Sequence, residues 1–299
     1  MAYLYLFLAL VGGLVKGFSG KKVSRDVESL NDGFTVNTLR TMFCAVIGFI
    51  VAAIQLSVSG VGFSGFALTP ESFGVCLASS VFMALFAISW LYAYKSEAYV
   101  FLSVFTMLAS VVTGLLGRII YGDELKPTRI VGFVLLFVAV YIMSLYNKKL
   151  TGKITKKGAL TLILGGLGAA LSDFCQKVYT KESLGEASVF TFYTYFLMLL
   201  PQIIILLAFF KTKQKRNPIL LDKRHIIIFF VMSAALYLNA LTKTLAAKDL
   251  PATQMYPTLQ GANLIASAIL ASILFKEKIT KRSALGIAIA IGAVIFMNV

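Results

Sequence analysis

The stretch Asp123-Glu-Leu-Lys-Pro-Thr-Arg-Ile-Val-Gly132 is matched in pattern, 154 positions later, by Glu277-Lys-Ile-Thr-Lys-Arg-Ser-Ala-Leu-Gly286. Each stretch follows one long apolar run and opens another, so an acid-led polar turn joins two hydrophobic segments twice in the chain. A pattern that returns at one fixed offset is the sequence signature of an internal repeat. The two turns therefore indicate a duplicated chain of hydrophobic helices.

The composition indicates that the surrounding solvent is lipid. Apolar residues make up 59% of the 299 residues, charged residues only 14%, and the mean hydropathy is +0.85. The formal net charge of +15 could suggest a nucleic-acid partner. However, the basic residues sit in short gaps between apolar runs and build no basic domain, which favours a membrane surface over nucleic acid.

Ten apolar runs approach or reach the length that a helix needs to cross a hydrocarbon core, about 20 residues. Helices are expected because lipid offers the backbone no hydrogen-bond partner. The expected class is therefore an all-α membrane protein with ten transmembrane helices. The predicted spans are 2–20, 34–58, 72–94, 98–117, 130–146, 158–180, 187–210, 226–247, 252–275 and 283–298.

The repeat extends beyond the two turns. Lys22-Val23 returns as Lys177-Val178 at an offset of 155, and Lys95 corresponds to Lys248 at an offset of 153. We expect a first five-helix repeat over 1–149 and a second over 150–299, which together form one membrane domain. Because five is an odd number, the second repeat enters the membrane from the opposite face, so the repeats are inverted.

These features together resemble the drug/metabolite transporter superfamily, in particular its EamA-type members. The residues that carry the resemblance are Arg40 early in the second span and the turns Gly122-Asp123-Glu124-Leu125-Lys126 and Lys276-Glu277-Lys278-Ile279-Thr280. Both turns depart slightly from the family's Gly-Glu-x-Leu/Ile-Thr/Ser pattern. The resemblance covers the whole chain and implies a carrier of small organic solutes. It also implies a central cavity between spans 1, 3, 4, 6, 8 and 9, in a multi-pass protein of a bacterial cytoplasmic membrane.

The loop charges predict an orientation. Most loop lysines and arginines follow odd-numbered spans, for example Lys148 and Lys149 after the fifth and Lys213 and Lys215 after the seventh. The positive-inside rule places these loops in the cytoplasm and both termini outside.

Matched polar stripes mark the fourth and ninth spans. Ser103, Thr106, Ser110 and Thr113 share one helical face, as do Tyr256, Gln260, Asn263 and Ser267. A polar stripe is costly against lipid, so both should face inward. The Ser/Thr stripe could form hydrogen bonds between helices or line a substrate cavity. The amide side chains of Gln260 and Asn263 favour the second interpretation, a cavity.

Most charged residues within the predicted spans allow two interpretations. Asp173 and Lys177 are four residues apart and can form an ion pair, or Asp173 can exchange a coupling proton or cation. Lys243 can extend to the membrane interface or, with Asn239 on its face, hold an anionic substrate group. Arg40 is expected to serve packing or lipid headgroups rather than substrate.

An aromatic stripe runs along the third span at Phe86, Trp90 and Tyr94. Such a stripe is typical of a core or an interfacial belt. Trp90 corresponds to Lys243 in the repeat, however, so Trp90 and Tyr94 are also candidates to stack on a solute. Gly13 with Gly17, and Gly114 with Gly117, indicate close helix packing.

Several chemistries are disfavoured by the residues present. Cys44, Cys76 and Cys175 have neither CxxC spacing nor a loop position, which disfavours a disulfide framework and a zinc site. His225 is expected to be a solvated loop histidine. The chain has no P-loop motif for ATP binding. We therefore expect no cofactor, no metal and no enzymatic activity.

Three functions of different classes remain. The first is a secondary transporter of a small polar metabolite, such as an exported amino acid or a related compound; nucleotide sugars and choline-like cations are alternatives within that class. The second is a lipid-handling protein or membrane enzyme, and the third is a membrane scaffold. The expected partners are a small-molecule substrate, the lipid bilayer and a coupling proton or ion, while the oligomeric state stays open.

Overall fold

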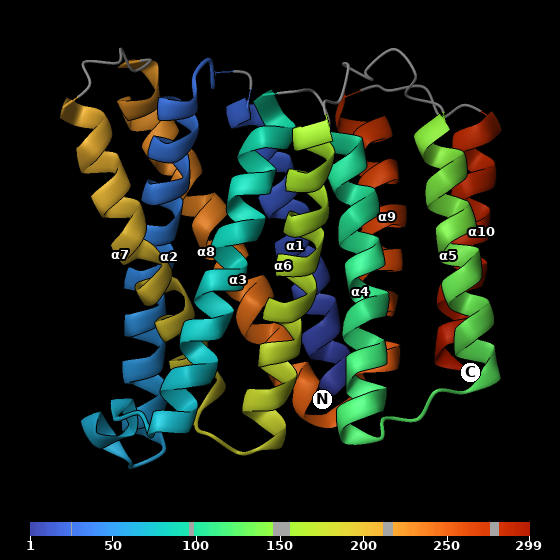
Figure 1. Ribbon diagram of the computed structural model, residues 1–299, viewed down its shortest axis with the longest axis horizontal. Helices are drawn as coiled ribbons and strands as arrows, with labels where there is room; N and C mark the ends of the chain where they lie inside the picture. Colours follow the sequence, from blue (N-terminus) through green and yellow to red (C-terminus); the bar gives the residue numbers. More distant parts are fainter. Residues whose placement is uncertain (25, 96–98, 146–155, 212–217, 276–280) are drawn as a thin grey trace. The chain divides into compact units, whose positions relative to one another are not determined.

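A computed structural model describes the chain except residues 25, 96–98, 146–155, 212–217 and 276–280. The described residues form ten α-helices, one at each predicted span (Figure 1). The helices are α1 (Ala2–Ser24), α2 (Leu30–Val58), α3 (Pro70–Lys95), α4 (Tyr99–Tyr121), α5 (Pro127–Leu145), α6 (Lys156–Lys181), α7 (Ala187–Lys211), α8 (Lys223–Asp249), α9 (Ala252–Phe275) and α10 (Lys281–Asn298). The 3-10 helices η1 (Gly62–Phe66) and η3 (Pro218–Leu221) lie in connections.

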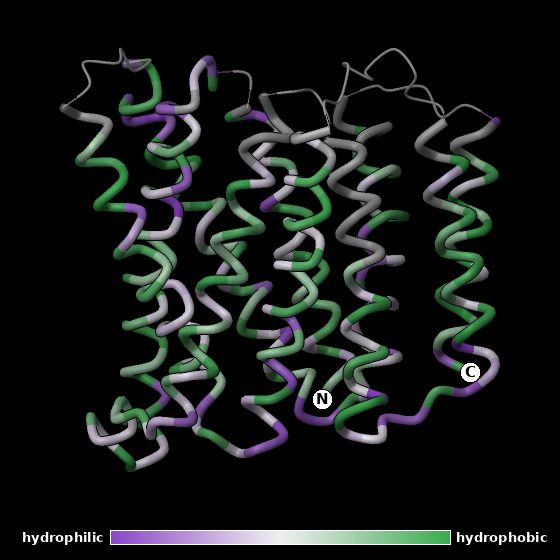
Figure 2. Tube along the Cα trace, viewed as in Figure 1, coloured by the Kyte–Doolittle hydropathy of each residue, from purple (hydrophilic) through white to green (hydrophobic). Residues whose placement is uncertain are grey.

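Hydropathy and length mark an integral, multi-pass membrane protein. Among the described residues, five helical segments are long and apolar enough to cross a membrane, namely Ala2–Gly20, Asn31–Val58, Pro70–Trp90, Ala187–Ala208 and Lys223–Asp249. Figure 2 shows apolar residues along the helices and hydrophilic residues mainly near helix ends. The expected all-helical class is confirmed, while the number of ten crossings stays a prediction.

Local side-chain chemistry decides where some helices begin. Ser29 and Asp32 form a capping box at the start of α2: the Asp32 amide donates to Ser29 Oγ at 3.1 Å, and the Ser29 amide donates to Asp32 Oδ2 at 2.9 Å. Helix α2 therefore begins four residues before its predicted start. At α3, Thr69 Oγ1 accepts from the Ser72 amide at 3.2 Å, ahead of Pro70 in the first helical position.

The chain divides into two compact units, each built from both halves of the sequence. Unit 1 comprises Met1–Ala87 with Cys175–Lys248, and unit 2 comprises Ile88–Phe174 with Asp249–Val299. In unit 1, α2 packs along its repeat counterpart α7; in unit 2, α4 packs along α9 and α5 along α10 (Figure 1). These units follow packing rather than the repeat, so the division into 1–149 and 150–299 stays a prediction.

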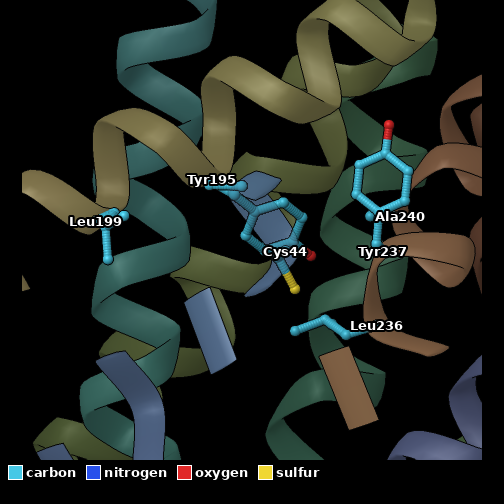
Figure 3. Close-up of a cluster of buried hydrophobic side chains, with 7 residues drawn as sticks. Cys44, Tyr195, Leu199, Leu236, Tyr237 and Ala240 are labelled. Carbon is cyan, nitrogen blue, oxygen red and sulfur yellow. The ribbon is translucent and has the colours of Figure 1, made fainter. Parts of the chain in front are cut away.

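The core of unit 1 includes a cluster where α2, α7 and α8 meet. Cys44, Tyr195 and Tyr237 are buried there, with Leu199, Leu236, Ala45 and Ala240 around them. Figure 3 shows the labelled side chains gathered about Cys44. Gly48 permits this packing, because a Cβ there would lie 2.9 Å from the Tyr237 ring and 3.1 Å from the Phe192 backbone.

The core of unit 2 depends on an equally close approach of α5 and α10. A Cβ on Gly132 would lie 2.7 Å from the Met297 side chain and 3.0 Å from the Ala293 carbonyl oxygen. Phe133 and Leu136 extend the same contact with Ala293 and Met297. The glycine that follows the acid-led turn is therefore a packing residue of the α5–α10 pair.

Candidate functional site

In unit 1, α1 and α8 meet at a close contact that we call the α1–α8 seam, formed by Ala9, Gly12, Ala235 and Asn239. The Asn239 amide Nδ2 donates to the Ala9 carbonyl oxygen at 2.6 Å. A Cβ on Gly12 would lie 2.6 Å from the Ala235 carbonyl oxygen. Asn239 is buried, so its side chain links two helices within the apolar layer.

Two lysines lie near the C-terminal end of α8. Lys243 is half-buried, one turn after Asn239 and on the same helical face. Lys177 of α6 is 1% exposed, and its Nζ donates to the Ala247 carbonyl oxygen at 3.1 Å. The last carbonyls of a helix carry partial negative charge, so this ammonium group caps α8. An ion pair of Lys177 with Asp173, and a coupling role for either residue, stay predictions.

In unit 2, hydroxyl groups of α4 and α9 donate to backbone carbonyls of α6. The Tyr256 hydroxyl donates to the Asp173 carbonyl oxygen at 2.6 Å, and Thr113 Oγ1 donates to the Ala170 carbonyl oxygen at 3.0 Å. Tyr256 and Thr113 belong to the two predicted polar stripes, and both are buried. For these two residues the structure shows hydrogen bonding between helices, which was one of the two interpretations of the polar stripes; the other was a substrate cavity.

The other predicted substrate contacts differ in burial. Ser110 is buried in α4, whereas Trp90, Gln260 and Asn263 are half-buried. Tyr94 lies in α3, but its side chain is outside what the structure describes. The structure thus shows hydrogen bonds from Tyr256 to the Asp173 backbone and from Asn239 to α1. Contact of the predicted residues with a substrate stays a prediction.

The acid-led turn has a structural role that its sequence did not reveal. Asp123 Oδ2 accepts from the Ala252 amide at 2.6 Å, at the first residue of α9. A carboxylate at this position satisfies a free helical amide and opposes the positive end of the helix dipole. Asp123 therefore caps α9, and the counterpart turn at Glu277 lies outside the described residues.

Arg129 extends this network, and the sequence reading missed it. Its Nη1 donates to Thr253 Oγ1 at 2.9 Å and its Nη2 to Gln254 Oε1 at 3.1 Å. Gln254 Nε2 in turn donates to Asn298 Oδ1 at 3.0 Å. Arg129 is buried, so the guanidinium ties the start of α5 to the start of α9. The only sequence signal was an arginine six residues after Asp123.

Two expectations require correction. His225 is not a solvated loop residue: it is buried in the first turn of α8, and its Nε2 lies 2.9 Å from Asp26 Oδ2. The pairing with Asp26, 199 positions away, provides the polar partner that makes burial acceptable. Gly17 is not a close-packing glycine, because a Cβ there would meet no atom of the described residues within 4 Å. Gly12 takes that role, while Gly114 and Gly117 pack against the start of α9 as expected.

Comparison with known proteins identifies the family. The EamA-like transporter family matches residues 3–145 and, separately, residues 156–299. The chain belongs to the EamA-like transporter family. This result confirms the resemblance to the drug/metabolite transporter superfamily, and the family matches each half of the chain separately.

Two further comparisons bear on this EamA-like protein. A solved structure described only as the crystal structure of a protein is 12% identical, with a TM-score of 0.75, and the match covers 99% of this chain and 96% of that one. At this identity the likeness supports the fold alone. No curated protein matches the chain.

Proposed function

We propose that the protein is a secondary transporter that exports a small polar organic metabolite, an amino acid or a related compound, by alternating access of its two repeats. The observation that carries the proposal is the retention of polar and charged side chains inside apolar helices, including Asn239, Lys243, Gln260 and Asn263. Placing such groups in a membrane is costly, and they are a common mark of substrate and ion pathways. Asn239 also links α1 to α8, a use that a scaffold protein would share, so Lys243, Gln260 and Asn263 carry most of the argument.

The proposed substrate contacts are those predicted from the sequence. They are Trp90, Tyr94, Ser110, Asn239, Lys243, Tyr256, Gln260 and Asn263. Asp173 and Lys177 are the proposed coupling residues. Asp173 is 8% exposed, and a carboxylate within a transmembrane segment is a common mark of a proton or ion pathway.

Counterflow in proteoliposomes tests the proposal. Separate vesicle samples are preloaded with each of the common amino acids in unlabelled form, and uptake of the same amino acid in tritiated form is compared with that of protein-free vesicles. We expect at least one member to accumulate in a protein-dependent way. If none of the common amino acids accumulates with correctly inserted protein, transport of this substrate class is wrong.

The coupling role of Asp173 has its own test. Asp173→Asn keeps the size of the side chain and removes its charge, so a proton-coupled carrier would lose accumulation driven by a pH gradient but retain counterflow. Lys181→Met, at an exposed position on the same helix, is the control. Equal loss of both kinds of flux in Asp173→Asn would indicate a structural role instead.

A further inference from the structure

The connection between α2 and α3 carries no charge. Neither an acidic nor a basic residue occurs from residue 41 to residue 70, which is the first residue of α3. Connections that lie in water are usually polar. The connection between α6 and α7, residues 182–186, follows that rule and has a glutamate at each end. The α2–α3 connection instead has the composition of a membrane-embedded segment.

Apolar side chains of the α2–α3 connection are nevertheless exposed on the surface of the protein. Phe63 in η1 is 74% exposed and Val61 is 50% exposed. Val58, the last residue of α2, is 84% exposed. Apolar surface in water forgoes the favourable free energy of burial, whereas the same surface in contact with acyl chains does not. The exposed side chains therefore fit an apolar surrounding.

Two ring contacts show that η1 folds back along α2 and α7 (Figure 1). The Phe66 ring stacks on the Phe49 ring at a centroid distance of 5.5 Å, and it meets the Phe192 ring edge-on at 5.8 Å. Phe49 lies nine residues before the end of α2, which is about 13 Å along the helix axis. Phe192 lies five residues after the start of α7, or about 7 Å. The Phe66 ring therefore lies beside these helices rather than beyond their ends.

That position corresponds to the edge of the hydrocarbon core. Helix α2 has 29 residues and is about 43 Å long, so it extends roughly 7 Å beyond each side of a core of about 30 Å if it is centred there. At about 13 Å from the end of α2, Phe49 lies inside the core. Phe66 stacks on Phe49, so η1 reaches the boundary between acyl chains and headgroups.

Hydrogen bonds within the protein pair polar groups of this connection. The Ala67 amide donates to the Ser64 carbonyl oxygen at 3.0 Å, and Ser64 Oγ donates to the Val61 carbonyl oxygen at 2.7 Å. The Tyr193 hydroxyl donates to the Phe66 carbonyl oxygen at 2.8 Å, which also ties η1 to α7. An unpaired backbone group is costly in lipid, so these bonds suit a segment that water does not reach freely.

We propose that residues 59–69 insert into one leaflet of the bilayer and that lipid acyl chains are the partner of their exposed apolar surface. Phe63 is the outer ring of this surface, because it stacks on Phe66 at 6.1 Å with an interplanar angle of 25° and is itself exposed. The inserted segment holds the end of α2 at a fixed depth in that leaflet.

Tryptophan fluorescence tests where position 63 lies. Phe63→Trp is made in a Trp90→Phe background, because Trp90 is the only tryptophan of the chain, and the protein is reconstituted into phosphatidylcholine vesicles. We expect emission at shorter wavelength than that of tryptophan in water. We also expect strong quenching by phosphatidylcholine that carries bromine on its acyl chains, and little quenching by iodide in the buffer.

Two positions of the same unit serve as references. Glu182→Trp is the matched control in the charged α6–α7 connection, where the residue is exposed. The hydrogen bond from Gln55 Nε2 to Glu186 Oε2, at 2.6 Å, places that connection at the same end of the unit as the end of α2. We expect iodide to quench this control strongly. Ile204→Trp, exposed within α7, should be quenched by the brominated lipid alone.

Two outcomes overturn the inference. A tryptophan at position 63 that iodide quenches as strongly as one at position 182 lies in water. A tryptophan at position 63 that neither iodide nor the brominated lipid quenches is covered by protein, as a second copy of the chain would cover it.

A spin label at a second position guards against a local effect of the tryptophan. Val61→Cys and Glu182→Cys are labelled with a nitroxide, and the buried Cys44, Cys76 and Cys175 set a low background. Oxygen concentrates in lipid and a nickel chelate in water, so we expect the ratio of oxygen to nickel collisions to be higher at position 61 than at position 182. An equal or lower ratio at position 61 contradicts insertion of the segment.

Discussion

The carboxylate of Asp123 accepts a hydrogen bond from the Ala252 amide at 2.6 Å, so a residue of the first half of the chain caps a helix of the second half. Gly117 makes room for this contact, because a Cβ there would lie 2.8 Å from Asp123 Oδ2 and 2.7 Å from the Ala252 Cβ. The acid and the small residue six positions before it therefore act together. The acid-led turn therefore connects the C-terminal end of α4 to the N-terminal end of α9.

Replacement of the capping carboxylate should weaken unit 2. Asp123→Ala removes the acceptor for the Ala252 amide and should cost about 1 kcal/mol of folding stability, whereas Asp123→Asn keeps an acceptor and should cost less. The measurement is the apparent Tm of the purified protein in detergent. Glu124→Ala is the matched control, since the Glu124 residue is exposed. Equal effects at positions 123 and 124 would contradict the cap.

Loss of the Lys177 ammonium group should destabilise the end of α8. Lys177→Met keeps most of the side-chain volume but leaves the Ala247 carbonyl without this donor, at a cost of about 1 to 3 kcal/mol. Thermal unfolding monitored by size-exclusion chromatography reports the change. Lys181→Met, exposed one turn later on α6, should leave the transition within error. An unchanged Tm in Lys177→Met would show that the cap contributes nothing.

A methyl group at Gly12 should force α1 away from α8. Gly12→Ala places a Cβ 2.6 Å from the Ala235 carbonyl oxygen, and because that atom is backbone, a helix must shift, at a cost of about 1 to 3 kcal/mol. Gly17→Ala is the control, because within the part of the chain that the structure describes its new Cβ would meet no atom within 4 Å. Both are compared by Tm and by counterflow. If Gly12→Ala leaves both the Tm and the counterflow unchanged, α1 and α8 pack less closely at the α1–α8 seam than the structure shows.

Tyr256→Phe separates a structural from a substrate role. Loss of the hydrogen bond to the Asp173 carbonyl should cost about 1 kcal/mol of stability and leave flux largely intact if the hydroxyl serves only α6. Both Tm and flux are measured on the same preparation. A wild-type Tm with abolished flux would instead make Tyr256 a substrate contact, as the sequence predicts.

The helices were predictable, because hydropathy and run length report burial in lipid directly. The errors at their ends have local causes: Ser29 and Asp32 begin α2 earlier than the apolar run does. Charge alone did not reveal the partners of Lys177 and Arg129, because those partners are a backbone carbonyl and neutral side chains more than 60 positions away. The pairing of His225 with Asp26 was missed because the two residues lie 199 positions apart in the sequence.

The side-by-side packing of α5 and α10 has a consequence for biogenesis. Helix α10 begins 136 positions after α5 ends, and at about 5 to 20 residues per second the ribosome needs on the order of 10 to 30 seconds to cover that distance. During this interval Phe133 and Leu136 are without the helix that later covers them. The nascent chain must therefore be sheltered by lipid or by an insertion chaperone until its last partner arrives.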